Sequence, residues 1–357
     1  MSVMTLAGRA ACVAAAAVVV IASAGAQGPD PGTPGEQGGR FKSGVELINV
    51  TATVTDAGGR FVPGLTQDDF LVYDDNNAVE IAQFNAERVP VSLGIVLDTS
   101  GSMAGTKMDA ARQALTRFTQ DLLDGADELF LYRFSNFPSL AQGWTSDRQR
   151  LLAALDRMTP YGGTAMYDAV SDALPLAREG HNRKRALVVI SDGNDTTSHT
   201  PIRELKDQIR ESEVLVYAVG IDGEGERSVR RAPIGTPPRI PMPIPFPFPG
   251  APRGRGGWPM PPPSGGSGGT SSSRRLDDHV NVTALREMTD DSGGRTEVVR
   301  DPRDLDPATA SIADELSKQY ALAYTAPGRK DGRWHSIRVE TKNRSLRVRS
   351  RRGYVAS

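Results

Sequence analysis

The chain has 357 residues, of which 38% are hydrophobic, so it is long enough for about two ordinary domains with buried cores. Its 42 basic and 43 acidic residues give a formal net charge of -1 at pH 7, which argues against a nucleic-acid-binding protein. The single cysteine, Cys12, lies in the N-terminal segment, so the rest of the chain has neither disulfides nor thiolate metal ligands.

The first 26 residues have the pattern of a signal peptide. A positive charge precedes an apolar run over residues 10–22, and an Ala-Gly-Ala sequence follows with the small side chains of a signal peptidase site. We therefore expect cleavage between Ala26 and Gln27 and export to the periplasm or the medium. The run is shorter than the roughly 20 residues of a membrane-spanning helix, so no permanent transmembrane anchor is expected. Residues 27–42 are predicted to be a linker.

A small β module is predicted over residues 43–88. Apolar and polar side chains alternate over residues 48–55, which is the period of a half-buried strand. A second strand is predicted over residues 70–73, before an Asp-Asp-Asn-Asn turn. Residues 79–84 are interpreted as the returning arm of that hairpin.

Between residues 89 and 319 short apolar strands alternate with amphipathic helices. This pattern is typical of an α/β, Rossmann-like domain, in which helices cover both faces of a central, mostly parallel sheet. Strands are predicted over residues 92–97, 128–134, 185–190, 214–219 and 295–299, and helical stripes begin near Ala111, Leu151, Met166, Ile202, Val282 and Ala308.

An insertion at residues 223–275 interrupts this domain. It contains 13 Pro and 11 Gly, a composition typical of disordered segments. Two interpretations stand for it, a semi-rigid surface loop and a docking segment for the groove of a partner.

Residues 320–357 are predicted to be a basic β segment. Between positions 329 and 352 the sequence has ten Lys or Arg but only two acidic residues. Strand alternation places Arg347 and Arg349 opposite the apolar positions, so most of this charge is interpreted as a solvated sheet face. Association with an acidic surface of the cell envelope is the alternative. The segment is also a candidate to pair with the N-terminal β module in one small sandwich.

Oxygen-bearing side chains gather where the first parallel strand is predicted to end. Asp98, Ser100 and Ser102 occupy alternate positions there, and Thr164 and Asp192 follow in two other loops at the same kind of place. Ligands collect at the carboxyl ends of strands in open parallel sheets, so we expect these side chains to converge. Hydroxyls and carboxylates without His or Cys predict Mg²⁺, with Mn²⁺ or Ca²⁺ as alternatives. The competing interpretation is that these residues only cap helices.

These five residues resemble the metal-ion-dependent adhesion site of von Willebrand factor A and integrin inserted domains. The resemblance implies that Ser100 and Ser102 bind the cation directly and that Thr164 does so in the ligand-competent state. It implies that Asp98 and Asp192 act largely through bound water. It also implies that an Asp or Glu carboxylate of a protein partner supplies a further ligand.

A second resemblance extends from Ile48 to Tyr354. Residues 162–168, 191–196 and 348–354 resemble the bacterial VWFA-related Acidobacterial domain family. An Asn-Asn pair replaces the usual glycine turn at residues 76–77, and the long insertion is a larger departure. This family implies a fold and a site without a specific activity.

The leading hypothesis is an exported protein that binds a protein partner through the cation, in adhesion, scaffolding or envelope assembly, and that is not an enzyme. The four histidines lack a metal-binding spacing, and neither a G-x-S-x-G nor an H-E-x-x-H motif occurs. Asp168, Asn194 and Asp195 are interpreted as caps. One alternative is a structural envelope protein with a merely stabilising ion, which binds through its basic tail. The other is a hydrolase that uses the ion to activate water.

Overall fold

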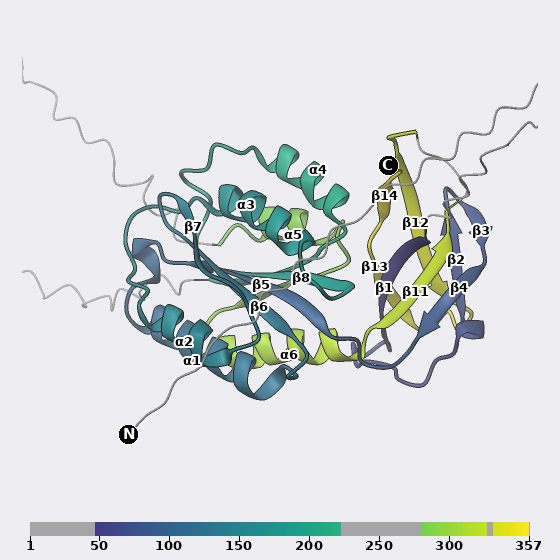
Figure 1. Ribbon diagram of the computed structural model, residues 1–357, viewed down its shortest axis with the longest axis horizontal. Coiled ribbons are helices and arrows are strands. Elements are labelled where there is room, and N and C mark those ends of the chain that lie inside the picture. Colours follow the sequence, from purple (N-terminus) through teal and green to yellow (C-terminus); the bar gives the residue numbers. More distant parts are fainter. Residues whose placement is uncertain (1–46, 223–279, 327–330, 357) are drawn as a thin grey trace, which may run out of the picture. The chain divides into compact units, whose positions relative to one another are not determined.

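The computed structural model describes residues 47–222, 280–326 and 331–356 (Figure 1). The predicted signal peptide, the linker and the insertion at residues 223–275 lie outside the described residues. Within the described ranges, no helix has the length and apolar character needed to cross a membrane.

A six-stranded sheet with the order β10-β9-β8-β5-β6-β7 forms the centre of the α/β domain. Its strands are β5 (Val91–Asp98), β6 (Glu128–Phe134), β7 (Pro138–Thr145), β8 (Lys184–Ser191), β9 (Leu215–Ile221) and β10 (Thr296–Val299). All pairs are parallel except β6 with β7. The predicted α/β fold with a mostly parallel sheet is therefore confirmed. Since β5 pairs with both β6 and β8, the strand order reverses between β5 and β8, and this point is where such sheets bind ligands.

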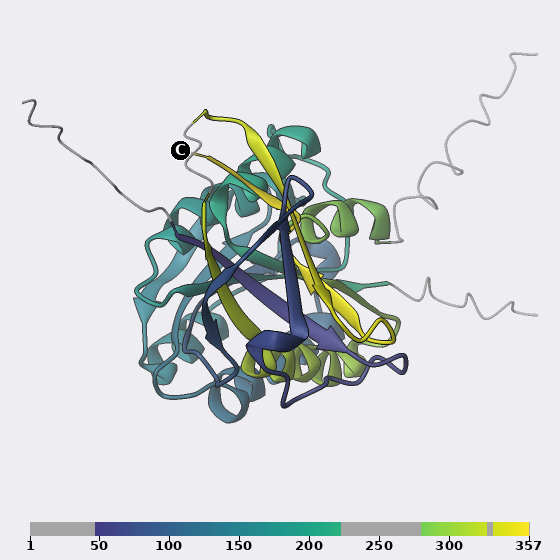
Figure 2. The same cartoon turned by 90° about the vertical axis from the view of Figure 1, so that its right-hand side faces the viewer.

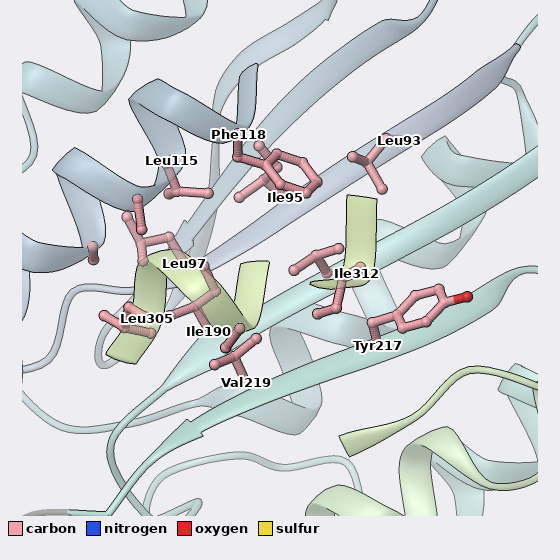
Figure 3. Close-up of a cluster of buried hydrophobic side chains, with 14 of the residues drawn as sticks. Leu93, Ile95, Leu97, Leu115, Phe118, Ile190, Tyr217, Val219, Leu305 and Ile312 are labelled. Carbon is pink, nitrogen blue, oxygen red and sulfur yellow. The ribbon is translucent and has the colours of Figure 1, made fainter. Parts of the chain in front are cut away.

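Helices cover both faces of this sheet (Figure 1). One face carries α1 (Thr106–Arg117), α2 (Arg148–Asp156) and α6 (Leu305–Lys318), and the other carries α3 (Met166–Arg178), α4 (Ile202–Ser212) and α5 (Val282–Thr289). Short helical turns lie at Gln67–Asp69, Gly101–Met103, Phe118–Leu122 and Pro302–Asp304. An apolar core lies on each face of the sheet. Figure 3 shows the one beneath α1 and α6, where Leu93, Ile95 and Leu97 of β5 pack in one cluster with residues of these helices. All eight residues of β5 are buried, which explains its unbroken apolar pattern.

Two four-stranded sheets stand beside the α/β domain, and Figure 2 looks onto them. One has the order β13-β1-β11-β4, and the other β14-β12-β2-β3. Their strands are β1 (Leu47–Thr55), β2 (Phe70–Asp74), β3 (Asn77–Val79), β4 (Ile81–Asn85), β11 (Tyr320–Thr325), β12 (Trp334–Thr341), β13 (Arg347–Ser350) and β14 (Gly353–Val355). Both sheets contribute to one apolar core. Each sheet thus combines strands from the beginning and the end of the described chain.

The predicted hairpin arm at residues 79–84 is wrong in part. Only β3 pairs with β2, whereas β4 crosses to the other sheet and pairs with β11. The reason is packing, because Phe84 on β4 lies 5.9 Å from the ring of Tyr320 and Ile81 is buried in the shared core.

A buried ionic cluster joins the α/β domain to these sheets. Glu315 of α6 is 7% exposed, and one of its oxygens accepts hydrogen bonds from Tyr217 of β9 (2.9 Å) and Thr53 of β1 (3.0 Å). Its carboxylate also pairs with Arg295 at 2.8 Å and with Arg349 of β13. Figure 3 shows the Tyr217 hydroxyl pointing away from the apolar cluster toward this site. One carboxylate therefore connects elements from both parts of the fold.

Two arginines of the basic tail form ion pairs with the α/β domain, which the sequence analysis did not predict. Arg349 pairs with Glu315, and Arg351 is 6% exposed and pairs with Glu213 at 2.8 Å. Arg347 is exposed, as expected. Alternation correctly predicts which side chains leave the sandwich core, but that face meets acidic residues of the α/β domain.

Candidate metal centre

Three loops at the carboxyl edge of the central sheet meet in one place. They are the β5 loop (residues 98–103), the α3 loop (residues 161–165) and the β8 loop (residues 191–196). The backbone N–H of Gly101 donates to Gly162 O at 3.0 Å, and that of Thr196 donates to Thr164 O at 2.9 Å. The backbone itself therefore holds the loops together.

Two glycines, Gly162 and Gly193, line the place where the loops meet. Gly162 has a φ of +76°, and a Cβ there would lie 2.8 Å from the side chain of Asn136. Asn136 Oδ1 in turn accepts from Gly163 N at 2.6 Å. A Cβ on Gly193 would lie 3.7 Å from Thr164 Oγ1 and 4.0 Å from Ser102 Oγ, so both hydroxyls border this glycine. A larger residue at position 162 would therefore be strained and would crowd Asn136, whereas a Cβ at position 193 would make ordinary contact.

The five residues singled out in the sequence come together. Ser100 Oγ lies 3.0 Å from Ser102 Oγ, which donates to Asp192 Oδ1 at 2.8 Å. Thr164 Oγ1 borders the same glycine as Ser102, and Asp98 Oδ1 accepts from Ser100 N at 2.7 Å. Ser102 is exposed and the other four are buried. The cluster thus has a buried base and one open side.

Its electrostatics favour a cation. Burial raises the pKa of Asp98 to about 6, although hydrogen bonds from Ser191 and Ser100 oppose this rise. Asp192 is buried as well, and the ammonium of Lys107 pairs with its Oδ2. Asn194 Oδ1 is also buried and has no hydrogen-bond partner. Two buried carboxylates beside three hydroxyls, with no nitrogen or sulfur ligand, fit a hard divalent cation.

Two contributors were missed from the sequence. Lys107 lies in the first turn of α1, shortly after the β5 loop, and its ammonium pairs with Asp192. Ser191 donates to Asp98 Oδ2 at 2.5 Å and braces it from the neighbouring strand. The sequence gives one indication that Lys107 and Ser191 belong to the site, which is that each lies at the end of an element next to it.

The interpretation of Asp168 and Asp195 as caps agrees with their contacts. Asp168 accepts from the backbone of Thr200 at 2.8 Å, and Asp195 accepts from the backbone of Tyr167 at 2.9 Å. These bonds tie the stretch after β8 to the first turn of α3.

The family description "von Willebrand factor type A domain" matches residues 93–194, which include all five residues. Among curated proteins, the inter-alpha-trypsin inhibitor heavy chain H4 of Homo sapiens is 26% identical over 136 residues, which is 35% of this chain and 14% of that protein. The heavy chain 4 of Mus musculus is 26% identical over 210 residues, 47% of this chain and 22% of that protein. The chain thus spans less than a quarter of the length of these relatives.

Solved structures with similar folds include three of low sequence identity. A von Willebrand factor type A protein from Catenulispora acidiphila has a TM-score of 0.46 and 13% identity, over 88% of this chain and 76% of that chain. BatB from Bacteroides thetaiotaomicron has a TM-score of 0.43 and 20% identity, over 64% and 98%. Proximal thread matrix protein 1 from the mussel byssus, with a zinc-occupied MIDAS motif, has a TM-score of 0.42 and 10% identity, over 68% and 49%.

Proposed function

The chain contains a von Willebrand factor type A domain, and from this premise we propose that it binds a protein partner through a divalent cation held by Asp98, Ser100, Ser102, Thr164 and Asp192. The observation that carries the proposal is the convergence of these side chains at the point where the strand order of the sheet reverses.

In this proposal Ser100, Ser102 and Thr164 hold the ion through their hydroxyls, and Asp98 and Asp192 hold bound water and orient the serines. The ion, Mg²⁺ or alternatively Mn²⁺ or Ca²⁺, supplies a Lewis-acidic position for a carboxylate of the partner. Neutral direct ligands leave most of its positive charge uncompensated, so an Asp or Glu of the partner is favoured.

Exposed apolar side chains in the adjacent loops support a protein partner. Tyr161 is 50% exposed and its N–H donates to Thr99 O, inside the β5 loop, at 2.8 Å. Phe137, after β6, is 73% exposed. Aromatic side chains of this kind carry much of the binding energy at protein interfaces. A partner carboxylate on the ion would bring its neighbours against them.

The basic tail is a weaker candidate for the binding surface. Arg349 and Arg351 already pair with Glu315 and Glu213, so they are not available to an external anion. For the hydrolase alternative, the contacts of the five residues within the described part of the chain include no histidine and no additional carboxylate. We propose a non-enzymatic binding protein, exported through its N-terminal segment, with residues 47–85 and 320–356 as one β-sandwich domain.

The test is metal binding by the full chain after removal of metals with EDTA. At 100 times its dissociation constant, Mg²⁺ should stabilise the folded state by about 2.7 kcal/mol, which corresponds to about 5–10 °C in melting temperature. Asp98→Ala and Ser100→Ala should abolish this shift, whereas Asp168→Asn, at a cap, should retain it. An equal shift in Asp98→Ala would refute the site.

A further inference from the structure

A second cluster of ligand-type side chains lies in the β sandwich. Asp74 at the end of β2, Asp75 after it and His335 of β12 each place one ligand atom within 4.8 Å of the other two. The sequence offers no spacing that unites them, because His335 is 260 residues from Asp75. The antiparallel pairing of β2 with β12, with Asp74 opposite Ile337, brings them together.

The imidazole of His335 has a defined orientation. Its Nδ1 lies 2.7 Å from Asp75 Oδ2, and its Nε2 lies 3.0 Å from Asp331 Oδ1. The side chain is 5% exposed and its ring packs 5.4 Å from that of Tyr354. A histidine that binds a metal through one nitrogen commonly donates its other N–H to a carboxylate, and Asp331 is placed to accept it.

Hydrogen bonds orient both aspartates. Asp74 is 1% exposed, and its Oδ2 accepts from Tyr324 (2.8 Å) and Tyr354 (3.0 Å). Asp75 Oδ1 accepts from the backbone N–H of Ser336 at 2.9 Å, so that Oδ2 is the oxygen near His335. Asp74 Oδ1 is buried and has no hydrogen-bond partner. A buried carboxylate oxygen in this situation is costly unless a cation or donor satisfies it.

We propose that Asp74, Asp75 and His335 bind a divalent transition metal ion of the zinc class, with Asp331 as the residue that positions His335. One nitrogen and two carboxylate ligands suit Zn²⁺, whereas the all-oxygen set at the carboxyl edge of the central sheet suits Mg²⁺. The two sites therefore differ in ion preference. The ion would clamp the turn after β2 onto β12.

The experiment uses the full chain with Asp98→Ala, which removes the other proposed site. After EDTA treatment and equilibrium dialysis against micromolar Zn²⁺, this protein should retain one more zinc ion per chain than the same protein with His335→Gln. His181→Gln is the matched control, since His181 is 84% exposed, contacts Glu128 and should leave zinc retention unchanged. Equal retention with and without His335→Gln would overturn the proposal.

A second pair of variants keeps the test decisive if His335→Gln impairs folding. Asp75→Asn changes a carboxylate that is 32% exposed, and it should likewise remove one zinc ion per chain. Asp331→Asn should keep the stoichiometry but weaken zinc affinity by about 10- to 100-fold. Bound Co²⁺ in place of zinc should lose its visible absorption in Asp75→Asn. An unchanged spectrum would show that Asp75 does not bind the ion and would overturn the proposed ligand set.

Discussion

The two ends of strand β8 carry opposite kinds of polar chemistry. At its amino end, Lys184 is 5% exposed and donates to Leu316 O at 2.8 Å, close to a Glu315 carboxylate surrounded by donors. At its carboxyl end, Ser191 braces Asp98 in a cluster that is open at Ser102 and in which the Lys107 ammonium pairs with Asp192. At the amino end, which we call the paired end, the Glu315 carboxylate is satisfied by arginines and hydroxyls that hold the two parts of the fold together. The carboxyl end, which we call the open end, has an excess of acceptors and can take up a cation.

Removal of the Glu315 carboxylate from the paired end should produce the largest effect, a loss of stability. Glu315→Ala leaves Arg349 without its carboxylate, Arg295 with Glu297 alone, and the hydroxyls of Tyr217 and Thr53 without their acceptor, so we expect the free energy of unfolding to fall by about 3–5 kcal/mol. Urea denaturation measures this loss. Asp314→Ala is the matched control, because this neighbour is 54% exposed and its pair with Lys318 should contribute at most about 0.5 kcal/mol. A loss below 1 kcal/mol for Glu315→Ala would contradict the paired-end interpretation.

Lys184 gives the paired end a pH dependence. Burial lowers its pKa to about 8, from an ordinary value near 10.4 in the unfolded chain. Between these values the unfolded state binds more protons, so the contribution of this residue to stability rises with pH, by up to about 3 kcal/mol. Unfolding of the parent and of Lys184→Met should be compared from pH 7 to pH 10.5. A difference between the two that stays constant with pH would rule out this assignment.

At the open end, removal of the Lys107 ammonium should change the affinity for Mg²⁺. Lys107 competes with a cation for Asp192, so Lys107→Met should tighten Mg²⁺ binding about fivefold, which corresponds to about 1 kcal/mol. Titration calorimetry measures the change. Lys206→Met serves as the control, since this side chain is similarly exposed but pairs with Glu287 instead. Weaker binding in Lys107→Met would mean that the ammonium supports the site.

The smallest effect on the molecule itself is expected at the exposed rim. Phe137→Ser should change the free energy of unfolding by less than about 0.5 kcal/mol and leave Mg²⁺ affinity unaltered. Retention of proteins on the immobilised chain, compared with and without EDTA, should nevertheless decrease. Full EDTA-sensitive retention by Phe137→Ser would place the partner elsewhere around the ion.

The sequence predicted the elements whose pattern is local. The strands of the central sheet are continuous apolar runs because both of their faces are buried, and four of the five site residues lie at the end of β5 or β8 or just after it. The fifth, Thr164, lies just before α3. It missed β7, whose residues are half-exposed along most of the strand and show no alternation. It also missed the partners of Arg349 and the neighbourhood of His335. These depend on contacts such as that between Thr53 and Glu315, 262 residues apart, which no local pattern records.

The interleaving of the sandwich strands has a consequence for the order of folding. β1 pairs on one side with β11 and on the other with β13, so its hydrogen-bonding groups on both edges wait for residues that are synthesised more than 250 positions later. The α/β domain between them can close on nearer contacts, while β1 remains without a strand partner and β2 pairs only with β3 until the last strands emerge. Unpaired strand edges recruit other chains, so this interval is when the nascent protein is most exposed to aggregation.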